Sequence, residues 1–522
     1  MKCQLAMKIS KAHIASGSLM ILLVVGIFFR FYNLTHKSFW LDEAKTALSI
    51  SGFKRDRDQM FQPGQPVEAK DLLVFQQPRP DRNLLDSIDY LACESLPHAP
   101  LFIVLLYSWI HAFGSSVFTM RLLPALISLL QLPAAYWLCL ELWGAPGIAL
   151  IATVLLGLSP VQVAYAQEVR EYSLYVVITL LTSASFLRAV RIQSIKAWIM
   201  YCTCMILALN TSVLATILAA TQLTYIILRK GLSWSKTLKR FIAVQFVTMC
   251  TCMPWLILYG KHFDLGSGIA SSPPGLTRLD LFKSWCINFS SSIFDMGHYW
   301  LKPVQALTAL VLLFELYVLI FVWRRSKRAS AFLLPTIAVN MLVLIALDLV
   351  FPTRFSVEVR FELPAMIAVL LCTAYTLTRN TSNKGNAHRA VWVILTFCVF
   401  ALEIISCAIS SQATTWREKN FKQHDLVKVA HILNQNPGVP LLVTESTDQA
   451  NPSQFLCLSH LLRGEVKLEV LGEPALPALP VNTKHFFLYN PSPVLRSFIA
   501  GTGRFTLRTV DNMDYLVQVD PK

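Results

Sequence analysis

The feature that most constrains this chain is a succession of apolar runs, most of them close to the length that crosses a bilayer as a helix. Backbone polar groups inside a bilayer must be hydrogen-bonded within the protein, and separate apolar runs achieve this as helices. We therefore predict an all-α polytopic membrane protein with about eleven membrane-spanning helices. The predicted spans are Ile14–Phe31 and the segments near 118–141, 147–161, 172–190, 196–210, 211–228, 239–259, 303–323, 331–351, 362–378 and 389–411.

The charge content supports a membrane protein and argues against binding to nucleic acid. Only 15% of the 522 residues are charged and 54% are hydrophobic, whereas a soluble domain carries about 25% charge. The net charge of +15 comes from Lys and Arg residues that cluster in short connectors between the apolar runs, which is how a polytopic protein orients itself. We therefore expect no nucleic-acid partner.

The basic connectors also predict the topology. Those around 188–196, 229–240, 324–328 and 379–389 are expected in the cytoplasm by the positive-inside rule. The first run follows three lysines and no small-residue cleavage site follows it, so we interpret it as an uncleaved helix with a cytoplasmic N-terminus. Counting spans places the loops 33–98 and 260–302 on the outer face. Leu101–Phe113 then starts and ends outside, which predicts a re-entrant or interfacial helix.

The tail predicts a separate domain. We divide the chain into a transmembrane catalytic module, 1–411, and a small extracytoplasmic α/β domain, 412–522. In the tail we expect helices and strands from their apolar periodicity, with a hairpin turn at Asp511-Asn512. The predicted helices are Asp425–Leu433 and Phe455–Leu462, and the predicted strands are Pro440–Val443, Phe486–Tyr489, Arg504–Val510 and Tyr515–Val519.

Two polar clusters follow the first helix. Asp42 and Glu43 stand just beyond the bilayer, behind the aromatic Trp40; burial would raise a carboxylate pKa and suit it to act as a general base. The alternative is an acid that caps a helix start. The second cluster contains His98, which could donate a hydrogen bond to a phosphate or simply pack at a helix start.

Two further clusters join later apolar runs at the outer face. Gln167 and Glu168 could position an acceptor hydroxyl, and Arg170 could pair with a carboxylate or a phosphate. Arg354 and Arg360 could hold a donor phosphate and stabilise the charge on a leaving group. Interfacial salt bridges and side chains that reach the lipid headgroups are the structural alternatives.

These clusters, in this order, resemble the GT-C glycosyltransferases related to protein O-mannosyltransferases and lipid A aminoarabinose transferases, with the closest likeness to the bacterial Rgt-type branch. That family carries W-x-D-E after its first helix, then H-P-P-L, then S-P followed by Q-E-A-R-x-Y, and late in the membrane R-Y-x-x-P. Here the first of these matches Trp40–Glu43 and the second matches His98–Leu101. The third matches Ser159-Pro160 with Gln167–Tyr172, and the fourth Arg360–Pro364.

The resemblance covers roughly 15–378 and shows departures. Ala99 stands where the family has its first proline, and Phe361 stands where it has tyrosine. The loop between Asp42 and His98 is also rather long. The substitutions affect the expected phosphate contacts, and the long loop suggests a remodelled acceptor site.

The resemblance implies an inverting transfer of a sugar from a polyprenyl phosphate at the outer face of a bacterial inner membrane. Asp42 would be the general base, with Glu43 or Glu168 orienting the acceptor hydroxyl. Arg360, with Arg354, Arg170 and His98, would neutralise the departing lipid phosphate. The acceptor could be a lipid, a polysaccharide or a protein.

The scheme demands no cofactor, and the sequence predicts no metal site: its 12 Cys include no C-x-x-C pair and no set with zinc-ligand spacing. Two other classes of protein remain open. A transporter or flippase for a lipid-linked substrate would also place charges near helix ends, although the chain shows no internal repeat. A non-catalytic scaffold related to these enzymes would tolerate the altered motifs.

Overall fold

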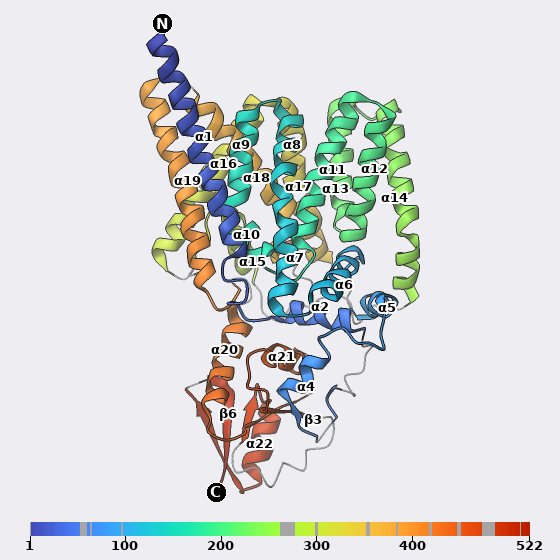
Figure 1. The fold of residues 1–522 in the computed structure, drawn as a ribbon, viewed down its shortest axis with the longest axis vertical. Coiled ribbons are helices and arrows are strands. Elements are labelled where there is room, and N and C mark those ends of the chain that lie inside the picture. Colours follow the sequence, from blue (N-terminus) through green and yellow to red (C-terminus); the bar gives the residue numbers. More distant parts are fainter. Residues whose placement is uncertain are drawn as a thin grey trace. The chain divides into compact units, whose positions relative to one another are not determined.

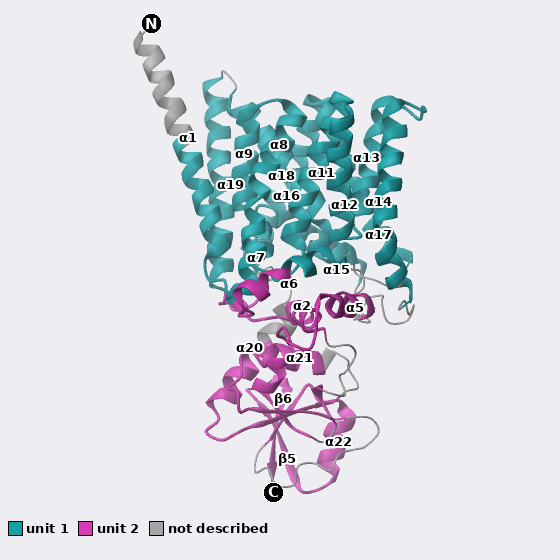
Figure 2. Cartoon of the chain, turned by 45° about the vertical axis from the view of Figure 1, so that its right-hand side comes forward, with its two compact units in different colours: residues 1–34, 96–105, 118–413 teal, residues 35–95, 106–117, 414–522 magenta. Residues whose placement is uncertain are grey.

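The protein is described here by a computed structural model that covers residues 2–52, 60–62, 65–94, 98–261, 277–297, 301–350, 355–382, 385–416, 420–445, 450–471, 486–511 and 513–522. These residues form two compact units, each assembled from separate stretches of the chain (Figure 2). Unit 1 comprises Met1–Leu34, Leu96–Leu105 and Phe118–Ala413, and unit 2 comprises Thr35–Ser95, Leu106–Val117 and Thr414–Lys522.

Unit 1 is a bundle of long helices that run side by side (Figure 1). Each predicted apolar run lies largely within helix, and the runs near 118–141 and 147–161 are each divided between two consecutive helices. The short helices α10 and α15 were not predicted. The helices are α1 (Lys2–Phe31), α7 (Val117–Leu129), α8 (Gln131–Trp143), α9 (Pro146–Leu158), α10 (Pro160–Ala166), α11 (Tyr172–Ile192), α12 (Ile195–Thr211), α13 (Ala215–Lys230), α14 (Lys236–Lys261), α15 (Arg278–Ser290), α16 (Lys302–Arg325), α17 (Lys327–Val350), α18 (Val359–Thr381) and α19 (Asn386–Gln412).

The helices of unit 1 confirm a multi-pass membrane protein. Among the described residues, 7 helices are long and apolar enough to cross a bilayer, or 8 if the bent pair α9 and α10 counts as one span. Gly17–Phe31, Leu101–Phe113 and Ile195–Thr211 are apolar but shorter. The count of about eleven spans, the orientation of the N-terminus and the re-entrant course of α6 (Leu101–Phe113) remain predictions.

Helix α1 packs on α9 at backbone distance. A Cβ atom added to Gly26 would lie 2.5 Å from the Gly157 carbonyl oxygen, so only glycine permits this approach. Arg30, one turn further along α1, is fully buried. Its guanidinium donates to the carbonyl oxygens of Gly26, at 3.1 Å, and Leu156, at 3.0 Å, and also to that of Gly157. The carbonyls of α9 therefore fix the position of α1 along its axis.

Helices α9 and α10 meet at an angle of 59°. Ser159 separates them and Pro160 opens α10, where its missing N–H leaves no intrahelical bond unmade. The Ser159 hydroxyl donates to the Ser292 carbonyl oxygen at 2.7 Å, which ties the bend to the buried segment that follows α15. The sequence marked Ser159-Pro160 as a motif, but it did not predict the bend.

Unit 2 contains a mixed six-stranded sheet in the order β1-β3-β2-β4-β6-β5. Strands β2, β3 and β4 are parallel, while β1 and the β5–β6 hairpin add antiparallel edges. Both of the faces of β4 are buried, as expected for a central strand. The strands are β1 (Val67–Glu68), β2 (Leu441–Glu445), β3 (Lys467–Leu471), β4 (Phe486–Tyr489), β5 (Phe505–Val510) and β6 (Met513–Pro521), and the helices are α2 (Leu41–Ser51), α4 (Ala69–Val74), α5 (Leu84–Glu94), α20 (Asn420–Gln435), α21 (Ala450–Leu458) and α22 (Pro493–Gly501).

The α/β character predicted for the tail is confirmed, including β2, β4, α20 and the β5–β6 hairpin. Strand β3 and helix α22 were not predicted. Residues Val67–Glu68 of the loop 33–98 pair with β3, so this loop and the tail fold as one unit and lie on the same side of the membrane. Which side that is, and the division of the chain at 411/412, remain predictions.

Candidate functional site

A buried polar network in unit 1 brings together motif residues that are far apart in the sequence. His98 Nδ1 lies 2.6 Å from Glu171 Oε1, and Arg170 Nη2 lies 3.0 Å from His98 Nε2. A guanidinium group only donates hydrogen bonds, so Nε2 of His98 is the acceptor and its proton is on Nδ1, where it is donated to Glu171. The hydrogen bonds are therefore donated in one direction, from Arg170 to His98 and from His98 to Glu171.

The charges of this network stabilise the ionised form of Glu171. Burial alone would raise the pKa of its carboxyl, but the positive charge that His98 carries when it is protonated, the hydrogen bond from His98 and, to a smaller extent, the charge of Arg170 lower the pKa to about 2. The Glu171 side chain is 11% exposed and that of His98 is 18% exposed. Both are sheltered enough for the pairing to be little weakened by solvent.

A small pocket adjoins the network, with an empty volume of about 320 Å³ that includes space open to solvent. Helix α11 supplies Tyr172 and Tyr175, whose side chains are buried. The connector before α13 supplies Ser212, which also forms an isolated β-bridge with His98, and Leu214. The remaining lining residues are His98, Glu171, Arg360 and Phe361.

Arg360 reaches this pocket from the first turn of α18. It forms an ion pair with Glu358, 3.3 Å between Nη2 and Oε2, and lies over the Phe361 ring at 5.2 Å. The carboxylate of Asp348 accepts the backbone N–H groups of Phe355 and Ser356, at 2.7 and 2.8 Å. This contact holds the short 3₁₀ helix Phe355–Val357 just before α18 and so helps to place Arg360.

Gln167 and Glu168 are buried and lie at the end of α10. The side-chain amide of Gln167 donates to the carbonyl oxygens of Phe29 and Tyr32, at 2.8 and 2.9 Å. These contacts satisfy carbonyls at the C-terminal end of α1, where a helix has no partner for them. Gln167 therefore has a structural role. The predicted role of both side chains in positioning an acceptor hydroxyl stays a prediction.

Asp42 and Glu43 belong to unit 2 and begin α2. Glu43 is fully buried, and its carboxylate accepts the Trp40 backbone N–H at 3.3 Å. Asp42 is half-buried, and its carbonyl oxygen accepts the Thr46 hydroxyl at 3.0 Å. The buried thiol of Cys457 on α21 has a raised pKa, first through burial and then through the charges of Glu43 and Asp42. The two adjacent acids therefore differ, because Glu43 is fully buried and caps α2 whereas Asp42 is half-buried.

Three of the four predicted phosphate-binding residues meet around this one network and pocket: His98, Arg170 and Arg360. Arg354 lies outside the described residues. Within the described ranges, no three His, Cys, Asp or Glu side chains come together as a metal site would require.

The prediction missed the part played by Glu171. The sequence signal that could have identified Glu171 is the segment Gln167–Tyr172, in which a second acid follows the arginine and directly precedes a long apolar run. It also missed Glu358 and Asp348, which hold Arg360 and the turn before it.

No protein-family model and no curated protein matches the chain. Solved structures do match it. ArnT from Cupriavidus metallidurans bound to undecaprenyl phosphate is 12% identical, with a TM-score of 0.54 over 97% of this chain and 98% of that one. Apo ArnT from the same organism is 13% identical, with a TM-score of 0.52 over the same shares. The likeness concerns the fold, and at that level it confirms the resemblance to GT-C glycosyltransferases.

Proposed function

We propose that this protein is a membrane glycosyltransferase that moves a sugar from a polyprenyl-phosphate donor to an acceptor hydroxyl, with inversion at the anomeric carbon. We place the reaction at the outer face of the plasma membrane, with a lipid, a polysaccharide or a protein as acceptor. The fold shared with ArnT, whose structure holds undecaprenyl phosphate, supports a lipid-linked donor.

The observation that carries the proposal is the convergence of His98, Arg170 and Arg360 around one network and pocket. They come from the start of α6, the start of α11 and the start of α18. A site for a lipid phosphate needs fixed donors and cations at the interface, and Arg is suited to hold phosphate oxygens in pairs.

In the proposed reaction, an acceptor oxygen attacks the anomeric carbon while the bond from that carbon to the phosphate oxygen breaks. The electron pair of the broken bond leaves with the polyprenyl phosphate, and the proton of the acceptor hydroxyl moves to the Asp42 carboxylate. Glu43 would hold the helix start that carries Asp42. Arg360 and the His98–Arg170 pair would stabilise the charge that grows on the departing phosphate, since preformed donors are most effective where charge develops.

The ion pair of Arg360 with Glu358 has a role in this scheme. With side chains 21% and 30% exposed, the pair is mostly buried, but Arg360 lines the pocket, where a bound anion could compete with Glu358. A donor phosphate would exchange with Glu358 as the partner of Arg360. The pair would thus keep Arg360 in place between turnovers.

The test is a transfer assay with the purified protein, a panel of radiolabelled polyprenyl-phosphate sugars and a membrane extract as acceptor. We expect label transfer from one donor, loss of transfer in Asp42→Asn, and transfer reduced about 100-fold in Arg360→Gln. Asp71→Asn is the matched control, because Asp71 is an exposed acid in the first turn of α4 in the same unit; it should transfer normally.

The assay also separates the other candidate functions. If folded wild-type protein transfers no label from any donor, the transferase proposal fails. Movement of an unmodified lipid-linked sugar across a proteoliposome membrane would then favour a transporter, and absence of both activities would favour a scaffold. Normal transfer by Asp42→Asn would remove Asp42 as the base.

A further inference from the structure

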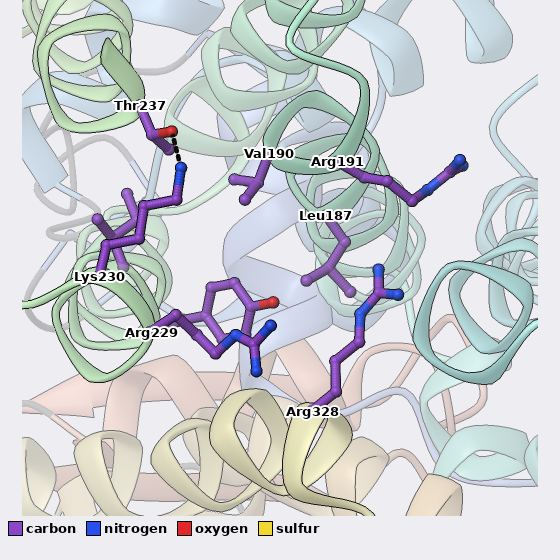
Figure 3. Close-up of a pocket in the computed structure, with 9 residues that line it drawn as sticks. Leu187, Val190, Arg191, Arg229, Lys230, Thr237 and Arg328 are labelled. Carbon is purple, nitrogen blue, oxygen red and sulfur yellow. Dashed lines mark hydrogen bonds between the residues drawn. The ribbon is translucent and has the colours of Figure 1, made fainter. Parts of the chain in front are cut away.

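A second pocket lies at the other end of α11 from the His98 network. It has an empty volume of about 720 Å³, including space open to solvent. It collects side chains from the last turns of α11 and α13 and the first turns of α14 and α17 (Figure 3). The lining residues are Leu187, Val190, Arg191, Tyr225, Ile226, Arg229, Lys230, Thr237 and Arg328.

Two of the four cations in this pocket already have partners. Arg191 forms a paired contact with Glu141, with nitrogen-to-oxygen distances of 2.8 to 2.9 Å. Lys230 Nζ donates to the Thr237 hydroxyl at 2.5 Å. Among the described residues, only the charge of Arg191 is paired with a carboxylate, since the Thr237 hydroxyl is neutral, and Arg229 and Arg328 are the two guanidinium groups available for a ligand.

Arg229 and Arg328 extend toward the same space from α13 and α17 (Figure 3). Within the part of the chain that the structure describes, neither guanidinium has a hydrogen bond or an ion pair with another residue. Two guanidinium groups that share a space repel one another unless an anion lies between them. Their arrangement is therefore suited to an anion.

The helix dipoles do not account for Arg328. A cation is favoured at the C-terminal end of a helix, which explains Arg191 on α11 and Arg229 on α13. Arg328, however, is in the first turn of α17, where the dipole disfavours a positive charge and the free N–H groups favour an anion. The positive-inside rule explains why basic residues occur in the connectors at this end of α11. It does not require their side chains to converge on one pocket.

The depth of the pocket indicates where the anion comes from. Helix α11 has 21 residues and is therefore roughly 30 Å long, which matches the hydrocarbon thickness of a bilayer. One end of it carries Glu171 and the other carries Arg191, so the pocket lies at the headgroup level of the opposite leaflet. Leu187, Tyr225 and Ile226 give it a buried apolar wall.

We propose that this pocket binds a phosphate ester, supplied by the headgroup of an anionic phospholipid in that leaflet. Arg229 and Arg328 hold the phosphate oxygens from two sides, as planar guanidinium groups do. The N–H groups at the start of α17 add to the binding. The bound lipid joins α13 to α17 at a position where the protein alone leaves positive charges facing each other.

The experiment compares lipid binding by the full chain in nanodiscs of phosphatidylcholine doped with phosphatidylglycerol, using native mass spectrometry to count retained lipids. We expect wild-type protein to retain phosphatidylglycerol, and the variant Arg229→Gln/Arg328→Gln to bind it about 30-fold more weakly, since the two lost contacts together correspond to about 2 kcal/mol. The matched control is Arg324→Gln/Arg325→Gln, which removes the same charge from exposed positions at the end of α16 outside this pocket.

Each outcome decides the proposal. An equal loss of phosphatidylglycerol binding in both double variants would overturn the proposal, because binding would then depend on net charge alone. Retention that does not differ between wild type and Arg229→Gln/Arg328→Gln would also overturn it. A second arm adds soluble glycerol phosphate to detergent-purified protein: binding that depends on Arg229 and Arg328 in this arm alone would keep the phosphate site and replace its lipid source. A thermal unfolding scan of each variant shows that the comparison is made on folded protein.

Discussion

The charged side chains at the two ends of α11 differ in how they are balanced. At the Tyr172 end, Arg170 and Glu171 are buried and are linked through His98, so charge is balanced contact by contact. At the Ile192 end, Glu141 accepts from Arg188 and Arg191, whose side chains are 43% and 47% exposed. Two further arginines there have no carboxylate partner among the described residues.

Solvent exposure explains this difference. A buried charge that loses its partner cannot be hydrated again, so the protein must satisfy it internally. A charge at the headgroup level can take water or a lipid as its partner. Substitution of a charged residue at the Tyr172 end should therefore lower the stability of the fold. Substitution of Arg229 and Arg328 at the Ile192 end should instead weaken lipid binding.

The largest expected effect is that of Glu171→Ala. Removing this carboxylate takes one charge out of a buried network that contains Arg170 and removes the acceptor of His98 Nδ1, which should destabilise the protein by about 3 kcal/mol. Thermal unfolding of the purified protein in detergent measures the effect. Glu171→Gln keeps an acceptor oxygen and should lose less. If Glu171→Ala unfolds at the wild-type temperature, the network contributes no stability and the comparison between the two ends fails.

The pH dependence is the next effect in size. The pKa of Glu171 is lowered from 4.5 to about 2 in the folded protein, so its carboxylate binds protons more readily when the chain is unfolded. Its contribution to stability is complete above about pH 4.5 and is lost as the pH falls toward 2. We expect the difference in unfolding temperature between wild type and Glu171→Gln to shrink over that window. A difference that stays constant from pH 6 to pH 3 would contradict this sign.

The smallest expected effect is that of Glu141→Gln. The arginines released by this change are nearly half exposed and can be hydrated, so stability should fall by less than about 1 kcal/mol. The same unfolding measurement applies. A loss as large as that of Glu171→Ala would mean that exposure does not set the difference between the two ends.

The helices of unit 1 could be predicted because apolar runs near bilayer length leave the backbone few alternatives. The bend after Leu158 could not, since it depends on the bond from Ser159 to Ser292, 133 residues away. In unit 2, β3 was missed because Lys467 and Glu469 interrupt its apolar pattern, although the structure buries Glu469 in the sheet.

The candidate site was predicted in its members but not in its contacts. His98, Arg170 and Arg360 follow from motif spacing. The pairing of His98 with Glu171 spans 73 positions and could not be derived from local pattern. The predicted role of Gln167 toward a substrate stays a prediction, whereas the contact of its amide with the end of α1 could not be predicted, because a sequence does not identify the partners of a helix end.

The contact between Arg30 and α9 has a consequence for the order of biosynthesis. Helix α1 carries an arginine whose acceptors on α9 lie 126 and 127 positions later in the chain. When α1 leaves the ribosome, those carbonyls have not yet been made. Until α9 is made, Arg30 has only the Gly26 carbonyl of its own helix as a protein acceptor, and an arginine in the membrane with few partners is costly, so we expect α1 to reach its final depth in the bilayer only after α9 has been inserted.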